Sequence, residues 1–307
     1  MYGNTARVGG TAGETVFSVI KNYIEVTKPR SVFLLVFTAA GAMLLAAGAG
    51  RIEPQFWMKA VLAITLACSG VNAVSCYVDR DLDAIMERTR NRPIPSGRIN
   101  PAYKALVWGL VQFGAALYLA WTLNLAAFLC ILLGMLGYVG IYNIWLKRKS
   151  TWNIILGGFS GGLPVLFGWA AVTGRIDLVP VLIALLVVLW IPNHIWNLAI
   201  FFKEDYRRVG VPMLPVVCDT DKTLLYILVT VIMMYGISLA VYYYAGLGMI
   251  YLVTAIVSGA AILAGNLYLY FKPGARRAWW LYKLSSPYLF ILFLGLIVDH
   301  WVYILRG

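Results

Sequence analysis

Residues 223–270 read TLLYILVTVIMMYGISLAVYYYAGLGMIYLVTAIVSGAAILAGNLYLY and contain no Asp, Glu, Lys or Arg. A helix that crosses the hydrocarbon core of a bilayer needs about 20 consecutive apolar residues. The segment is long enough for two such helices, and the Ala-Gly-Leu-Gly run at 245–248 is typical of a turn between them. It therefore predicts a pair of transmembrane helices.

Composition extends this interpretation to the whole chain. Of the 307 residues, 61% are hydrophobic and 12% are charged, whereas soluble domains carry about 25% charged residues. Apolar runs separated by Gly, Pro or charged residues predict an all-α polytopic membrane protein with about nine transmembrane helices. These helices are expected over 31–50, 56–78, 102–121, 124–143, 153–172, 178–201, 223–245, 249–271 and 283–304. Residues 31–307 are thus expected to form a single transmembrane domain.

The residues before the first predicted span, 1–30, form a separate N-terminal segment. Within it, apolar side chains at positions 16, 19, 20, 23 and 26 repeat with helical spacing. A helix with one apolar face buries that face in the headgroup region and keeps its charges in water. We therefore expect an amphipathic helix from Thr15 to Lys28 that lies along the cytoplasmic surface of the membrane.

The distribution of Lys and Arg predicts the orientation of the chain. If the N-terminus is cytoplasmic, nine spans leave four of the 25 basic residues on the other side: Arg51, Lys59, Arg175 and Arg306. This asymmetry follows the positive-inside rule, and it puts the C-terminus outside. We expect a multi-pass protein of the cell membrane with its charged loops in the cytoplasm. Because this bias explains the net charge of +12, no nucleic-acid partner is expected.

A polar loop at about 79–101 begins with paired carboxylates. On a helix that continues the second span, Asp79 and Asp83 share a face, and Asn72 falls on the same stripe. Glu87 is expected to extend the stripe, and Asp81 points elsewhere. Like charges four residues apart destabilise a helix, so the stripe indicates a hard divalent cation such as Mg²⁺. An alternative is a solvated helix end whose acids pair with arginines of the same loop. These arginines are Arg80, Arg88, Arg90 and Arg92.

A second polar group surrounds the end of the sixth predicted span. Polar side chains at membrane depth usually face the bundle interior or a cavity, which makes His194 either a cavity residue or a hydrogen-bonded packing residue. In the following loop, Lys203 and Asp205 are candidates for phosphate binding and for a second cation site. Asp205 has an adjacent acid, Glu204, and we expect at most one of the two to face the site.

A third group, Tyr142 with Lys147 and Arg148, has two interpretations. It fits positive-inside anchors beside an aromatic belt, and it fits contacts to an anionic substrate. Together, the loops offer carboxylates for divalent cations, basic side chains for phosphate, and an apolar interior. A lipid diphosphate meets all three requirements, because cations stabilise the charge on a departing diphosphate and an apolar chamber keeps water from the carbocation.

Several motifs of the sequence resemble those of the intramembrane (UbiA-type) prenyltransferase superfamily. The run DYRRVGVPMLP that starts at Asp205 is similar to the haem branch of that superfamily, whereas the first acidic motif is shared more widely. The motifs that carry the resemblance are YVDRDLD at 77–83, MERTRNRP at 86–93, LKR at 146–148, NIILGG at 153–158, GWAAVTG at 168–174, HIW at 194–196 and the run from 205 to 216.

The resemblance implies nine helices around a central cavity and Mg²⁺-dependent transfer of a farnesyl group. The substrates would be farnesyl diphosphate and haem B, with the farnesyl group attached at a haem vinyl carbon. Asp79 and Asp83 would be metal–diphosphate ligands, with Asp205 as a further metal ligand. The expected substrate contacts are Asn72, Ser75, Tyr142, Lys147, Arg148, Arg88, Arg92 and Lys203, with His194 and Trp196 at the acceptor end of the cavity.

One departure from the superfamily keeps other activities open. The superfamily has Asn four residues before the first metal-binding Asp, but this chain has Ser75, and Asn72 is the predicted substitute. A quinone precursor, an aromatic acid or a glycerol lipid is therefore an alternative acceptor. A transporter is disfavoured, because the charges gather at one face and no repeat is detected. Protein partners from the haem pathway stay open.

Overall fold

The computed structural model describes residues 15–50 and 52–306, and every regular element in these ranges is helical. The all-α prediction is confirmed, and nine helices of the described residues are long and apolar enough to cross a membrane. They are α2 (Pro29–Ala47), α3 (Pro54–Val78), α5 (Tyr103–Trp121), α6 (Leu125–Met135) continued by η1 (Leu136–Leu146), α7 (Asn153–Thr173), α8 (Leu178–Phe201), α11 (Thr220–Tyr244), α12 (Met249–Phe271) and α13 (Ala275–Arg306). Of the predicted N-terminal segment, residues 1–14 lie outside the described residues.

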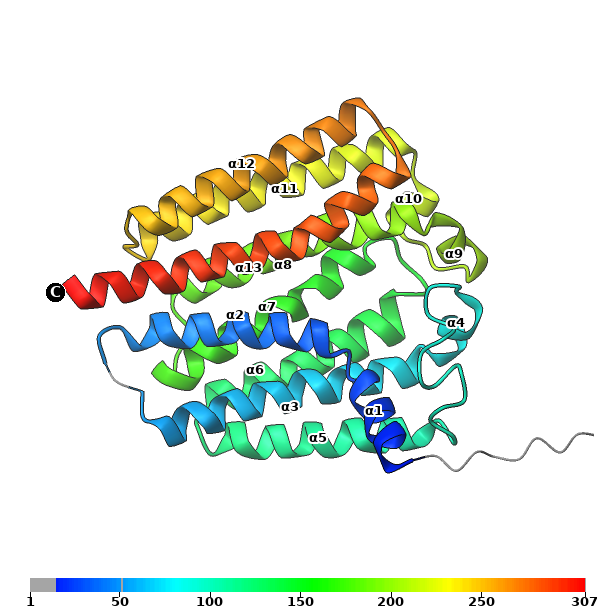
Figure 1. Cartoon of the computed structure of the whole chain (residues 1–307), viewed down its shortest axis with the longest axis horizontal. Coiled ribbons are helices and arrows are strands. Elements are labelled where there is room, and N and C mark those ends of the chain that lie inside the picture. Colours follow the sequence, from blue (N-terminus) through cyan, green and yellow to red (C-terminus); the bar gives the residue numbers. More distant parts are fainter. Residues whose placement is uncertain (1–14, 51, 307) are drawn as a thin grey trace, which may run out of the picture.

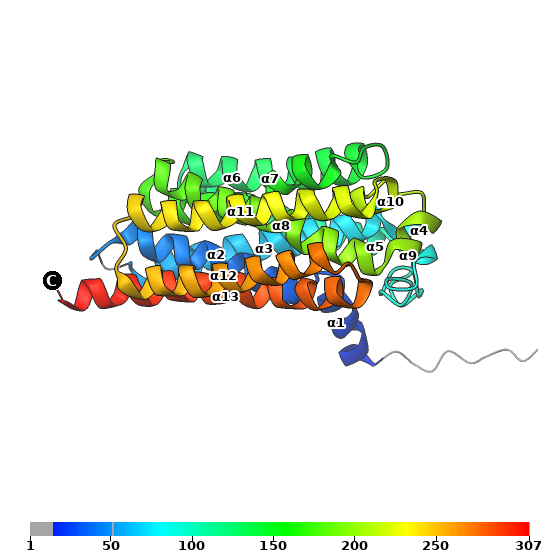
Figure 2. The same ribbon diagram turned by 90° about the horizontal axis from the view of Figure 1, so that it is seen from above.

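Four short helices lie at one end of the bundle, opposite the C-terminus (Figures 1 and 2). They are α1 (Val16–Glu25), α4 (Arg80–Ile85), α9 (Lys203–Arg208) and α10 (Leu214–Val217). The two charged loops that the sequence places far apart, at about 79–101 and 203–222, therefore meet at this end.

The last helix begins earlier than the sequence predicts. Its expected start was residue 283, because basic residues precede that position, but α13 begins at Ala275. Arg277 donates to the carbonyl oxygen of Lys272, and Lys283 lies over the rings of Trp279 and Trp280. Long basic side chains at a membrane edge bend toward water while their stems stay on apolar surface, so they do not end the helix.

Glycines bring the first spans close together. An added Cβ at Gly168 of α7 would lie 2.1 Å from the carbonyl oxygen of Ala39 in α2, and one at Gly70 of α3 would lie 2.6 Å from that of Gly109 in α5. Small residues permit this approach of backbones inside a membrane. The two helices that flank the charged loop at 79–101, α3 and α5, therefore lie close together.

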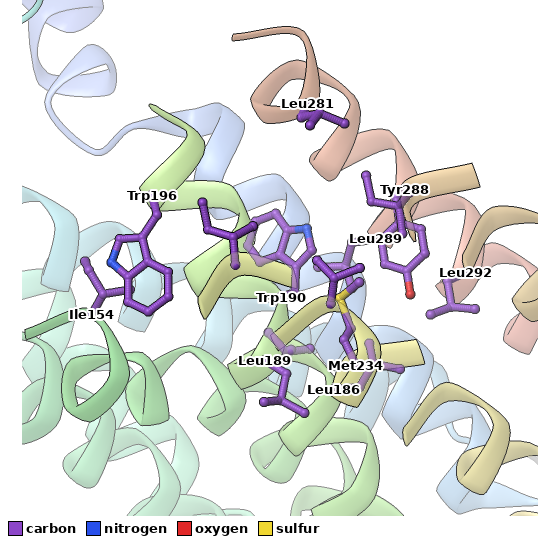
Figure 3. Packing of buried hydrophobic residues seen from close by; sticks show 14 of the residues in the cluster. Ile154, Leu186, Leu189, Trp190, Trp196, Met234, Leu281, Tyr288, Leu289 and Leu292 are labelled. Atoms are coloured by element: carbon purple, nitrogen blue, oxygen red, sulfur yellow. The ribbon is translucent and has the colours of Figure 1, made fainter. Parts of the chain in front are cut away.

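The second half of the bundle has a filled core. Figure 3 shows Leu186 of α8, Met234 of α11 and Leu289 of α13 packed together with other large apolar side chains. All three are at most 2% exposed. A cavity lies instead among the first six spans.

Candidate active site

A cavity of about 240 Å³ opens among α2, α3, α6, η1, α7 and α8. Its wall is mainly apolar, with the aromatic rings of Tyr138, Tyr142, Trp190 and Phe167. Asn72, Ser31 and Lys28 also line it. The cavity expected from the sequence is therefore present, and it has both an apolar chamber and polar lining groups.

Asp79 lies where α3 passes into α4 and is 4% exposed. Lys147 donates to Asp79 Oδ2 at 2.5 Å, and the Asn143 side-chain amide donates to the same oxygen at 3.4 Å. The same amide donates to Ser75 Oγ at 2.7 Å. The other carboxylate oxygen, Oδ1, is buried and has no hydrogen-bond partner among the described residues. A buried carboxylate oxygen without a partner is costly unless a cation or water satisfies it.

Asp83 continues the stripe one turn later. Its backbone amide donates to the Asp79 carbonyl oxygen at 2.9 Å, so helical spacing persists across the junction, and its side chain is also buried. Arg92 donates to Asp83 Oδ2 at 2.7 Å. The predicted alternative, pairing with an arginine of the same loop, therefore describes Asp83, whereas Asp79 pairs with Lys147, the residue that follows η1.

Asp81 faces away from this stripe, as its position on the helix predicts. It is exposed and accepts two 2.7 Å hydrogen bonds from Arg148. These bonds from the guanidinium lower the pKa of Asp81 below its ordinary value. Arg148 thus pairs with Asp81 at the surface of the site, and the residue before it, Lys147, pairs with Asp79.

Asp205 joins the two charged loops. Its carboxylate accepts hydrogen bonds from the backbone amides of Glu87 (3.3 Å) and Arg88 (3.2 Å) and is buried. Glu87 lies beyond the end of α4 and is exposed, so it does not extend the carboxylate stripe as expected. Within the described ranges, no three acidic, His or Cys side chains gather closely enough to hold a metal ion. A metal-binding role for Asp205 stays a prediction.

The remaining basic candidates line the end of the bundle. The Arg88 guanidinium lies 5.7 Å from the centre of the Phe202 ring, and Lys203 is half-buried at the start of α9. A cation over a ring face is favourable. Both residues lie within the loops that Asp205 holds together.

The helix register of η1 brings its side chains to the site. Tyr138 and Tyr142 line the cavity, and Asn143 and Lys147 reach Asp79. At the 3.6 residues per turn of an α-helix, Tyr138 and Lys147 would point in opposite directions. A π-helix has about 4.4 residues per turn, which returns both to one side.

Two residues of the site were missed from the sequence. Asn143 supplies an amide next to Ser75, the position at which the superfamily carries Asn. Lys28 lines the cavity, has a left-handed backbone with φ of 56°, and forms no ion pair within residues 15–50 and 52–306. Both looked ordinary in sequence: Asn143 ends an apolar run, and Lys28 resembles a positive-inside anchor.

His194 lines the cavity, whereas Trp196 does not. The His194 ring packs between the rings of Trp190 and Tyr282, with centroids 4.5 Å away in each case. Trp196 is buried in the apolar core that Figure 3 shows, and its indole N–H has no partner in the described part of the chain. The acceptor-end assignment of both residues stays a prediction.

Comparison with known proteins agrees with this arrangement. Residues 34–296 match the UbiA prenyltransferase family. The chain belongs to this family. A protoheme IX farnesyltransferase of Desulforudis audaxviator is 57% identical over 92% of the chain and 89% of the relative. Protoheme IX farnesyltransferase 1 of Cenarchaeum symbiosum is 42% identical over 91% of the chain and 95% of the relative.

Solved structures of the UbiA prenyltransferase family share the fold. A digeranylgeranylglyceryl phosphate synthase has a TM-score of 0.75 at 20% identity, covering 92% of this chain and 98% of that protein. A UbiA homolog from Archaeoglobus fulgidus, bound to DMAPP and Mg²⁺, has a TM-score of 0.63 at 16% identity, covering 88% and 99%. Identities this low support the fold alone.

Proposed function

We propose that the chain transfers a farnesyl group from farnesyl diphosphate to a vinyl group of haem B, which gives haem O. The observation that carries the proposal is Asp79, whose buried Oδ1 has no hydrogen-bond partner among the described residues. Its contact Asn143 follows Tyr142, which lines the apolar cavity together with Lys28. The substrates are inferred from the names of relatives that are 57% and 42% identical over most of the chain.

The residues present fit a divalent cation, and the cation of the proposal is Mg²⁺. Asp79 Oδ1 is available to it, and Asp83 becomes available when Arg92 turns to an arriving anion. Mg²⁺ takes one or two carboxylates and completes its shell with phosphate oxygens and water. When bound, it stabilises negative charge on the leaving diphosphate.

The basic side chains act on the same charge. Lys147 and Arg92 are paired with Asp79 and Asp83, and each can exchange its carboxylate for a phosphate oxygen. The bond between farnesyl C1 and the diphosphate oxygen breaks, and the electron pair leaves with the diphosphate. C1 then bonds to the terminal vinyl carbon, and water adds to the inner vinyl carbon with loss of a proton.

The cavity protects the carbocation until it meets the vinyl group. Tyr138 and Tyr142 present aromatic rings to the cavity, and ring faces stabilise cations. Gly157 makes room for Tyr142, since an added Cβ there would lie 2.6 Å from its ring. The apolar walls exclude water from the reacting carbon.

The test is farnesyl transfer by protein purified into lipid nanodiscs. With farnesyl diphosphate, haem B and Mg²⁺, we expect mass spectrometry to detect haem O. Asp79→Asn removes the cation-binding charge, and we expect turnover to fall by about 10³-fold or more. Asp81→Asn is the matched control, because Asp81 is exposed and turned away from the cavity. Wild-type turnover in Asp79→Asn would refute the metal assignment.

The same assay distinguishes the alternative acceptors. A quinone precursor, an aromatic acid and a glycerol lipid phosphate are offered in competition with haem B. Preferential prenylation of one of them would overturn haem B as the substrate while leaving the prenyltransferase activity intact.

The proposal also includes the orientation in the cell membrane. Lys and Arg gather at the end of the bundle that carries α1, α4 and α9, and the positive-inside rule assigns this end to the cytoplasm. The exposed apolar side chains of α1, Phe17 and Ile20 among them, support an interfacial position for this helix. In this orientation the active site faces the cytoplasm.

A further inference from the structure

We infer that His194 binds the iron of the haem substrate through Nε2, a role that rests on the proposed function and specifies how the acceptor is held. Nothing in the chemistry of farnesyl transfer requires such a ligand. The inference comes from the hydrogen bonds and packing of this side chain inside the cavity.

The hydrogen bonds assign the protons of the imidazole. The Ser285 hydroxyl donates to the carbonyl oxygen of Tyr282 at 2.6 Å, which uses its one proton. At its 2.6 Å contact with His194 Nδ1, Ser285 Oγ is therefore the acceptor, and Nδ1 carries the hydrogen. His194 forms no ion pair with an acidic side chain in the described chain, and a neutral imidazole protonated at Nδ1 has its lone pair on Nε2.

The surroundings also fix the plane of the ring. Trp190 stacks on one side, with an interplanar angle of 21°, and Tyr282 packs at 37°. The Trp190 indole N–H donates to the Ser285 carbonyl oxygen at 2.8 Å, which ties the stacking partner to the hydrogen-bonding partner. Metal-binding histidines are usually held in this way, with the second ring nitrogen hydrogen-bonded so that the ligand is oriented in advance.

The position of His194 connects this ligand to the reaction site. His194 and Tyr142 line the same cavity, and Tyr142 precedes the Asn143 amide that contacts Asp79. A haem held by its iron at His194 would thus share the chamber that receives the prenyl chain. The fixed iron then limits which porphyrin edge reaches the diphosphate end.

Other side chains with metal-binding atoms provide controls. Cys68 and Cys130 line the cavity, and a thiolate–iron bond has a spectrum different from that of an imidazole–iron bond. The sequence has one other histidine, His300, whose Nε2 lies 3.3 Å from the Gly48 carbonyl oxygen near the C-terminal end of the last helix. His300→Ala is the matched control for loss of a histidine.

The experiment is a titration of the full-length protein in nanodiscs with ferric haem B, followed by absorbance and electron paramagnetic resonance. We expect a histidine-ligated spectrum in the wild type and in His300→Ala, and its loss in His194→Ala with about 10–100-fold weaker haem binding. Added imidazole should restore the spectrum of His194→Ala. Metal-free protoporphyrin IX should bind the wild type and His194→Ala equally, because it has no iron.

Three results would overturn the inference. They are an unchanged spectrum in His194→Ala, a thiolate spectrum in the wild type, and equal weakening of haem and metal-free porphyrin in His194→Ala, which is what a packing role predicts. A wild type that makes haem O but binds haem without histidine ligation refutes the iron ligand alone. A wild type that neither binds haem nor makes haem O refutes the proposed function as well.

Discussion

Lys28 combines an unfavourable backbone conformation with a charge that has no ion-pair partner among the described residues. A left-handed conformation at a residue other than glycine costs about 1–2 kcal/mol, and such strain persists where the surrounding structure demands it. The side chain is half-buried, lines the cavity and forms no ion pair in the described ranges. A charge kept in this state favours an anionic ligand, and farnesyl diphosphate is the anion of the proposed reaction.

We therefore predict that Lys28→Met raises KM for farnesyl diphosphate by about tenfold, the loss of one charge-assisted hydrogen bond of about 1.4 kcal/mol. Steady-state kinetics at saturating haem B measure this. Lys28→Gly should give the same increase, because glycine keeps the left-handed backbone and the ammonium group is lost with the rest of the side chain. Lys21→Met, at an exposed position of α1, is the control. An unchanged KM in both Lys28 variants would exclude the contact.

For single residues, the sequence predicts the positions that depend on spacing along one helix. Asp79 and Asp83 are four residues apart, and their backbone hydrogen bond keeps them on one side while Asp81 faces out. The partners Lys147 and Asn143 are not predictable in this way, because they depend on how η1 packs on α3 and on its register. Asn72 lines the cavity, but the amide beside Ser75 belongs to Asn143.

The π-helix η1 positions the basic group of the site. π-Helical segments are rare and often occur at functional sites, since the hydrogen bonds of an α-helix are more favourable. The π-helix changes the direction in which the later side chains point, because its wider turn brings Lys147 to the same side as Tyr138. The hydropathy of residues 124–143 predicts a span, but hydropathy contains no information on whether it has an α or a π register.

Deleting Gly140 should rotate Lys147 away from Asp79 by about one residue step of 80–100°. We expect turnover to fall at least tenfold, and the deletion combined with Lys147→Met to be no worse than the deletion alone, because Lys147 is already displaced. Gly140→Ala keeps the length and is the control, because an added Cβ there meets no atom within 4 Å. A thermal unfolding midpoint close to that of the wild type excludes misfolding. Additive losses in the double variant would contradict a role through Lys147.

An ion pair links helix α1 to the charged loop at 79–101, beside apolar packing of Tyr23. Arg98 donates to both carboxylate oxygens of Glu25, at 2.7 and 2.8 Å, and to Asn22 Oδ1 at 2.9 Å. The hydrogen bond from Arg98 lowers the pKa of Glu25 below its ordinary value of 4.5. A lowered carboxyl pKa contributes stability that is present above pH 4.5 and is lost as the pH falls through the folded-state pKa.

We predict that amide hydrogen exchange in residues 16–25, corrected for intrinsic rates, stays constant from pH 7 to pH 5 and accelerates below pH 4.5. Glu25→Gln should exchange faster at pH 7 and lose this pH dependence, because it has no titrating carboxyl group. Lys21→Gln, which leaves the ion pair in place, should behave like the wild type. Equal exchange in Glu25→Gln and the wild type would show that the ion pair does not hold α1.

For the whole molecule, the apolar runs predicted nine spans because each spanning helix must be long and apolar, independent of its neighbours. Which helices enclose the cavity depends on packing that the runs do not specify. Glycines draw α2 onto α7, large side chains such as Leu289 fill the other half, and the cavity opens among the first spans. The charged loops meet at one end because an even number of spans separates them.

The orientation of the chain is testable, because residues in successive loops of a multi-pass protein must lie on opposite sides of the membrane. Lys149 and Arg175 are exposed and flank α7. In a variant whose four cysteines are replaced, we expect a membrane-impermeant maleimide added to intact cells to label Arg175→Cys. Lys149→Cys should be labelled only after the membrane is opened, because the basic end stays in the cytoplasm. Labelling of Lys149→Cys in intact cells, with Arg175→Cys protected, would invert the topology and place the proposed site outside.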